Sequence, residues 1–160
     1  MNINELNELP DWRDDHNEEE TGQLNETKEI CKKLYQKWNE ILMMINGATA
    51  DSENNDTSEE VFLKHSNKAA MLADAYEIGA KLRSSEARSM FINKMENAAI
   101  IRKNAQFVKS SMLTLVMEGE IAEEYGELIR TEIDVFRELF IWWVKSFKKD
   151  DNSDEWGLFN

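Results

Sequence analysis

The feature that most constrains this chain is a helical apolar repeat between Leu24 and Phe147 that contains no proline. Apolar residues recur every three or four positions in four blocks, which is the spacing of residues on one face of an α-helix. Polar or glycine-containing breaks separate the blocks. The repeat therefore predicts an all-α fold, an antiparallel up-down-up-down four-helix bundle.

Turn and cap residues set the expected boundaries. The first helix is expected from about Thr21 to Ile45, the second from Ser58, and the third after a turn at Ser84-Ser85-Glu86. Gly119 is the expected C-terminal cap of the third helix, and the fourth helix follows at once and reaches Phe147. The bundle then occupies residues 21–148, preceded by an acidic arm, expected to be mobile, over residues 1–20. Residues 149–160 form an acidic tail with an aromatic tip.

Each block predicts its own inward-facing residues, which in the first block are Thr27, Ile30, Cys31, Leu34, Trp38, Ile41 and Ile45. The second block predicts an inward stripe of Val61, His65, Ala69, Leu72, Tyr76 and Gly79. The fourth block predicts one of Ile121, Tyr125, Leu128, Ile129, Ile133, Phe136, Leu139, Phe140, Trp143 and Phe147.

Charge argues against two classes of partner. The formal net charge is −13, which disfavours binding to nucleic-acid backbones and to anionic lipid. Basic residues are concentrated between Gly79 and Met117, and acidic ones between Gly119 and Glu138. Two such stretches would attract each other as antiparallel neighbours, which is the favoured interpretation. The alternative is a basic face for an anionic partner.

The remaining composition is that of an ordinary soluble protein. No apolar run approaches the ~20 residues of a membrane span, and the N-terminus has no basic segment followed by an apolar one. Cys31 is the single cysteine, so no intrachain disulfide can form, which fits a reducing compartment. We expect a cytoplasmic protein with Cys31 as a buried structural thiol.

Three polar residues interrupt the apolar stripes. They are His65, Asn104 and Glu132. Folding the chain at its expected turns brings all three to nearly one height, beside Trp38. Because an unpaired buried polar group costs several kcal/mol, roughly 2–7 for a neutral one, such residues should pair. The pattern predicts a buried layer of His65, Asn104, Glu132 and Trp38, which either fixes helix register or lines a small ligand pocket.

Metal and cofactor chemistry has little support. Di-iron bundles need Glu-x-x-His pairs on two helices, and here Phe62 stands three positions before His65. One histidine with one glutamate is too small a ligand set for zinc or iron. We therefore expect no metal, no cofactor and no catalytic residue. Lys94, also on an apolar stripe, has a stem long enough to carry its ammonium to the rim.

The segment His65-Ser66-Asn67-Lys68-Ala69-Ala70 resembles the phosphorylated-histidine segment of histidine phosphotransfer domains, which are also four-helix bundles. Those domains carry histidine, then lysine three residues on, then glycine, where this chain has Ala69. The resemblance implies a phosphorelay carrier that uses His65.

Large apolar groups also lie away from the expected core. Ile141 and Trp142 point off the inward face of the fourth helix, so they either form a contact site or are covered by the arm or the tail. The tail Lys148–Asn160, an acidic linker followed by an aromatic tip, resembles the terminal peptide with which bacterial single-stranded-DNA-binding proteins recruit partners. Folding of Trp156, Leu158 and Phe159 back onto the bundle is the favoured interpretation, with a recruiting peptide as the alternative.

These patterns favour a non-enzymatic binding or adaptor protein. Its expected partner is a protein, either a second copy or a different chain. The alternatives are a phosphorelay carrier and an acidic mimic of nucleic acid that inhibits a DNA-binding enzyme.

Overall fold

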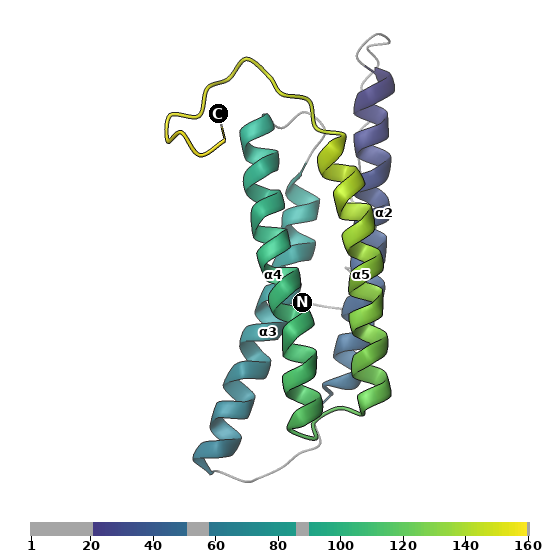
Figure 1. Cartoon of the computed structure of the whole chain (residues 1–160), viewed down its shortest axis with the longest axis vertical. Helices are drawn as coiled ribbons and strands as arrows, with labels where there is room; N and C mark the ends of the chain where they lie inside the picture. The colour runs from purple at the N-terminus through teal and green to yellow at the C-terminus, as the bar shows by residue number, and fades with distance from the viewer. Residues whose placement is uncertain (1–20, 51–57, 86–89, 160) are drawn as a thin grey trace.

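The computed structural model describes residues 21–50, 58–85 and 90–159. These residues form four helices and no strand: α2 (Thr21–Ala48), α3 (Glu59–Ser84), α4 (Phe91–Met117) and α5 (Glu123–Lys145). Successive helices are antiparallel and pack as neighbours, and α5 closes the bundle against α2 (Figure 1). The predicted four-helix bundle is confirmed. The predicted arm at residues 1–20 lies outside the described residues.

Two of the predicted helix ends are confirmed by their hydrogen bonds. Ser58 is the N-cap of α3, and its side chain accepts a hydrogen bond from the Val61 amide at 3.3 Å. Gly119 follows α4 with a φ of 75°. Its amide donates to the Val116 carbonyl, and the Glu120 amide donates to the Leu115 carbonyl. This pair of bonds is the Schellman motif, which needs the left-handed backbone that glycine adopts without strain.

The start of the third helix was predicted too early. Helix α4 begins at Phe91, and Met90 is its N-cap residue with no side-chain capping bond. The connection from α3 is therefore several residues longer than the two-serine turn expected. This difference shifts the heights of all residues on α3 relative to those on α4.

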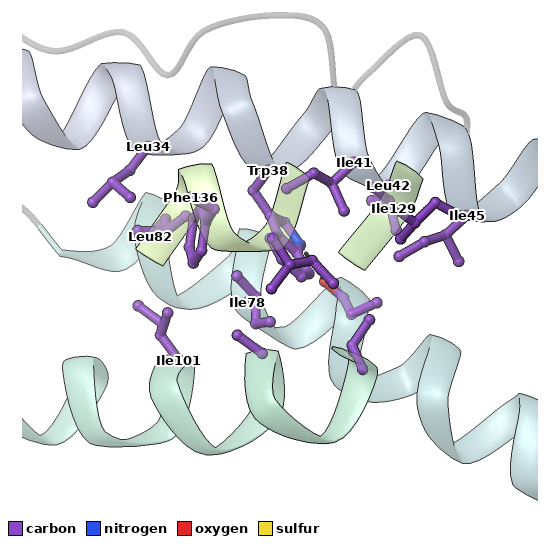
Figure 2. Packing of buried hydrophobic residues seen from close by; sticks show 14 of the residues in the cluster. Leu34, Trp38, Ile41, Leu42, Ile45, Ile78, Leu82, Ile101, Ile129 and Phe136 are labelled. Atoms are coloured by element: carbon purple, nitrogen blue, oxygen red, sulfur yellow. Dashed lines mark hydrogen bonds between the residues drawn. The ribbon is translucent and has the colours of Figure 1, made fainter. Parts of the chain in front are cut away.

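The core lies between all four helices. Trp38, Leu34 and Ile41 of α2 are fully buried, as are Ile78 and Leu82 of α3. Figure 2 shows these side chains pointing into the shared interior beside Ile101 of α4 and Phe136 of α5. The first block's prediction is confirmed at Cys31, Leu34, Trp38, Ile41 and Ile45.

The second stripe was predicted on the wrong side of its helix. The buried residues of α3 are Met71, Ala75, Ile78, Gly79 and Leu82, so Gly79 alone of the predicted stripe is buried, Leu72 and Tyr76 are partly buried, and His65 and Ala69 are exposed. Helix α3 is rich in alanine and apolar on nearly every side, so residues spaced by three and four positions fit more than one face. The periodicity identified the helix but not its orientation.

Helix α3 also extends beyond the body of the bundle. Its first turns project past the adjacent ends of α4 and α5 (Figure 1). None of residues 61–70 is buried, and Phe62 is 68% exposed.

A close approach of glycine determines the orientation of the first turn of α5. A Cβ placed on Gly126 would lie 2.5 Å from Cγ2 of Val116, so only glycine lets α5 lie this close to α4. With Gly126 and Ile129 facing inward, Tyr125 and Leu128 are turned toward solvent. Their predicted inward orientation was wrong for this reason.

The two buried helical glycines should respond oppositely to alanine. A Cβ at Gly79 meets no atom within 4 Å, so Gly79→Ala should raise the free energy of unfolding by about 1 kcal/mol through helix propensity. Gly126→Ala gains the same propensity but must displace the stiff Val116, so we expect a net loss of about 1 kcal/mol. Urea denaturation of both variants measures the contrast. Equal effects would contradict the close approach.

Candidate functional site

Two members of the predicted polar layer, Trp38 and Asn104, each form a hydrogen bond to α3, at positions two residues apart. Trp38 and Asn104 are both completely buried. The Trp38 indole Nε1 donates to the Ala75 carbonyl at 2.7 Å, and Asn104 Nδ2 donates to Glu77 Oε2 at 2.7 Å. Trp38 and Asn104 thus each contribute a hydrogen bond that joins their own helix, α2 or α4, to α3.

His65 is not part of this group, which corrects the sequence prediction. Its side chain is exposed on the first half of α3. The prediction folded the chain at Ser84-Ser85, but α4 begins at Phe91, so Asn104 lies level with Glu77 rather than with His65. Glu77 lies twelve residues beyond His65, so the level of Asn104 on α3 differs from the predicted one by about three turns.

Glu132 also lies outside the group. It forms an ion pair with Lys37 of α2, at the α2–α5 boundary, and its side chain is 26% exposed. Burial opposes protonation of Lys37, but its hydrogen bonds to Glu132 and Glu40 raise the pKa of its ammonium above the ordinary value. Glu132 is therefore a partly solvated surface partner rather than a group in the core.

What remains of the predicted layer is a set of hydrogen bonds between helices. Asn104 Oδ1 is buried and has no hydrogen-bond partner within the part of the chain that the structure describes. A shallow hollow does occur on the surface, but Leu63, Lys64 and Met117 line it at the opposite end of α4 from the α3–α4 connection. The geometry of Trp38 and Asn104 suits helix registration more than ligand binding.

A second polar group, which the sequence did not predict, joins the tail to the start of α4. Asp150 Oδ2 accepts a hydrogen bond from the Phe91 amide at 2.8 Å, so it caps α4 in place of Met90. This hydrogen bond lowers the pKa of the Asp150 carboxyl. The Lys94 ammonium, predicted to reach the rim, instead lies 5.8 Å from the centre of the Phe147 ring.

Lys94 and Cys31 are both buried beneath this cap. Burial lowers the pKa of the Lys94 ammonium, although the Asp150 carboxylate and Cys31 oppose the shift. Burial raises the pKa of the Cys31 thiol to about 12, against the effect of Lys94. The thiol donates to the Leu82 carbonyl at 3.6 Å. Such a thiol is protonated at neutral pH and is a poor nucleophile, which fits the structural role predicted for it.

The tail tip is held away from the bundle, contrary to the favoured sequence interpretation. Trp156 is 94% exposed and Leu158 is 73% exposed, while Phe159 is partly covered. The Asp154 carboxylate accepts hydrogen bonds from the amides of Trp156, Leu158 and Phe159, at 3.0, 2.6 and 3.0 Å. These bonds replace the expected packing against the bundle and form a compact turn that displays two large apolar side chains.

Ile141 and Trp142, which were predicted to point away from the inward face of α5, are exposed as well. Trp142 is 64% exposed, and Ile141 is less so. Between the neighbouring helices α4 and α5, Lys109 and Asp134 form an ion pair at 2.6 Å. This ion pair is an instance of the attraction predicted between the basic and acidic stretches.

Three searches add no relative to this description. No family model matches the chain, and no curated protein or solved structure matches it significantly. Within residues 21–50, 58–85 and 90–159, no three His, Cys, Asp or Glu side chains group in a way that could hold a metal ion. The same residues include no helix long and apolar enough to cross a membrane.

Substitution of Asn104 tests the registration role. Asn104→Leu removes the unpartnered Oδ1 and leaves exposed Glu77 in water, so the free energy of unfolding should stay unchanged or rise by about 1 kcal/mol. Asn104→Asp places a charge in the core beside Glu77 and should lower it by about 3 kcal/mol.

Chemical denaturation monitored by circular dichroism gives both values, with Gln106→Leu on the exposed side of α4 as the control. A loss of more than about 2 kcal/mol for Asn104→Leu would show that the bond to Glu77 itself holds the helices.

Proposed function

We propose that the chain is a non-enzymatic binding protein whose main contact group is the C-terminal tip, residues 154–159. The observation that carries the proposal is the turn around Asp154, which presents Trp156 and Leu158 to solvent. Tryptophan is enriched among residues that dominate binding energy. An apolar pair displayed by a preformed turn loses less entropy on binding than one on an unstructured chain.

The polar cap on α4 supports the same proposal. The Asp150 bond to the Phe91 amide fixes the base of the tail four residues before Asp154. The tip therefore leaves the bundle from a defined point, next to the α4 N-terminus (Figure 1). Trp142 and Ile141 offer a second, smaller apolar contact on the outer side of α5.

Substitutions in the tip should reduce the amount of partner protein that the chain captures. Trp156→Ala should reduce partner capture by about 30-fold, as expected for a central tryptophan worth about 2 kcal/mol. Asp154→Asn should reduce it as well, because the amide side chain carries no charge to hold three backbone N–H groups. Trp142→Ala should have a smaller effect, with helicity unchanged. Quantitative mass spectrometry of proteins captured by each immobilised full-length variant measures the losses.

Asp151→Asn is the matched control, because Asp151 is an exposed neighbouring carboxylate with no hydrogen bond assigned to the tip. It should capture the same proteins as the wild type. Recovery of one identical set by all four variants would rule out the tip as a contact group.

A second candidate function, a phosphorelay carrier, is favoured by the exposure of His65. A phosphoryl acceptor must be reachable by the active site of a donor protein, and a side chain on the projecting part of α3 meets that condition. Lys68 lies one turn further on, with its ammonium bonded to the Thr49 carbonyl at 3.2 Å. This candidate ranks second because the resemblance that suggested it rests on a six-residue segment.

Phosphotransfer has a direct test. After incubation with labelled, autophosphorylated histidine kinases, the carrier would hold acid-labile phosphate on His65, and His65→Gln would hold none. We expect no transfer to either protein. Label on the wild type alone would make phosphotransfer the first candidate.

A further inference from the structure

The outer surface of α3 and α4 carries an unusual stretch without charge. In residues 61–73 of α3 and 104–117 of α4, no exposed residue is Asp, Glu, Lys or Arg. Charged residues make up 32% of the sequence, so segments of this combined length would ordinarily contain several exposed charges. We call this surface the α3–α4 face; its exposed residues are Phe62, Leu63, His65, Ser66, Asn67, Ala69, Ala70, Ala73, Gln106, Phe107, Ser110, Leu113, Thr114 and Met117.

The face is apolar as well as uncharged. Met117 is 87% exposed and, with Leu63, forms the apolar part of the shallow hollow at the end of α4, which Lys64, Asn67 and Glu118 also line. Phe62 lies on the projecting turns of α3, and Phe107 lies further along α4. The three lysines of these segments are partly buried: Lys68 donates to the Thr49 carbonyl, Lys109 pairs with Asp134, and Lys64 lines the hollow.

The other two helices show the contrast. Exposed charges are frequent along α5, at Glu123, Glu124, Glu127, Arg137, Glu138 and Lys145, and along α2, at Glu26, Glu29, Lys33 and Glu40. Two copies of a chain with a formal charge of −13 repel each other at long range. Contact through α2 or α5 would also desolvate carboxylates, which is costly without matched partners. Contact through the α3–α4 face desolvates none.

We propose that the α3–α4 face binds the same face of a second copy, forming a two-fold symmetric dimer. A two-fold contact pairs each residue with another on the partner in both directions. The pattern on α3 suits this arrangement: an antiparallel pairing centred between residues 67 and 68 sets Phe62 opposite Ala73 and Ser66 opposite Ala69. The large side chain of each copy then lies over a small one of the other, and the alanines allow close approach.

The size of the face indicates a reversible dimer. Each segment is roughly 18–20 Å long at 1.5 Å per residue, and two packed helices give a width of roughly 20 Å. The two copies together would bury on the order of 800–1,000 Å², the low end for specific association. We therefore expect dissociation in the range of tens of micromolar. The dimer does not depend on the proposed role of the tip.

Sedimentation equilibrium of the full-length chain, from about 2 to 300 µM, tests the proposal; this range brackets the expected dissociation constant. The wild type should pass from monomer to dimer. Ala73→Glu should weaken association at least tenfold, because each dimer buries two new charges. Ala80→Glu is the matched control: it makes the same change two turns further along the same side of α3, outside the face, and should leave association unchanged.

Phe62→Ser provides a second variant that does not depend on Ala73, and since Phe62 lies on projecting turns its loss cannot disturb the core. It too should weaken association at least tenfold, with an unchanged circular dichroism spectrum. A wild type that stays monomeric to 300 µM would overturn the proposal. So would equal association by wild type and Ala73→Glu.

Two further outcomes would show that the second copy binds elsewhere or that the face binds something other than a second copy. Loss of the dimer in Trp156→Ala but not in Ala73→Glu would place the self-contact at the tail tip and overturn the proposal. Binding of monomeric wild type to phosphatidylcholine vesicles, abolished by Ala73→Glu, would assign the face to a lipid surface instead. Failure of the tip as a partner-binding group would leave the dimer measurement unaffected.

Discussion

The bundle depends on a column of aromatic rings that joins α2 to the C-terminal half of α5. Trp38 packs against Phe136 with 4.9 Å between ring centroids, and the column continues through Phe140 and Trp143 to Phe147. The Trp38 indole also donates to the Ala75 carbonyl, so one side chain fixes three helices. Because aromatic rings bury large areas and prefer tilted contacts, the column sets the height of α5 and places Phe147 over Lys94.

Features encoded by short segments could be predicted from the sequence. Three such features are the start of α3 at Ser58, the glycine cap at Gly119 and the inward face of α2. Each depends on residues that lie within one or two helical turns of one another. The relative heights of residues on different helices could be predicted less accurately than these local features. Pairing His65 with Asn104 required the length of the α3–α4 connection, and no glycine or proline in the sequence marks where that connection ends. Asn104 was recognised as a polar exception, but its partner Glu77 was not.

The incorrect prediction of which side of α3 faces the core and the absence of exposed charge on the α3–α4 face have one physical origin. Helix α3 has small apolar residues on its solvent side as well as on its core side, so its amphipathic contrast is weak. That weakness made its orientation ambiguous in the sequence, and in the folded chain it leaves apolar surface where a bundle helix ordinarily carries charge. The exposed charges of α3 and α4 therefore lie outside residues 61–73 and 104–117, for example at Glu77 and Arg102, whereas exposed charges are frequent along α2 and α5.

The cap on α4 has a consequence for how the chain is made. Phe91 is the first residue of α4. The carboxylate that caps its amide belongs to Asp150, which lies 59 residues further along the chain. During synthesis on the ribosome, α4 emerges long before that carboxylate exists, and Met90 offers no side-chain substitute. The first turn of α4 therefore stays uncapped until Asp150 has been synthesised. A chain ended early, even just after α5, would contain all four helices and still lack the residue that fastens one of them.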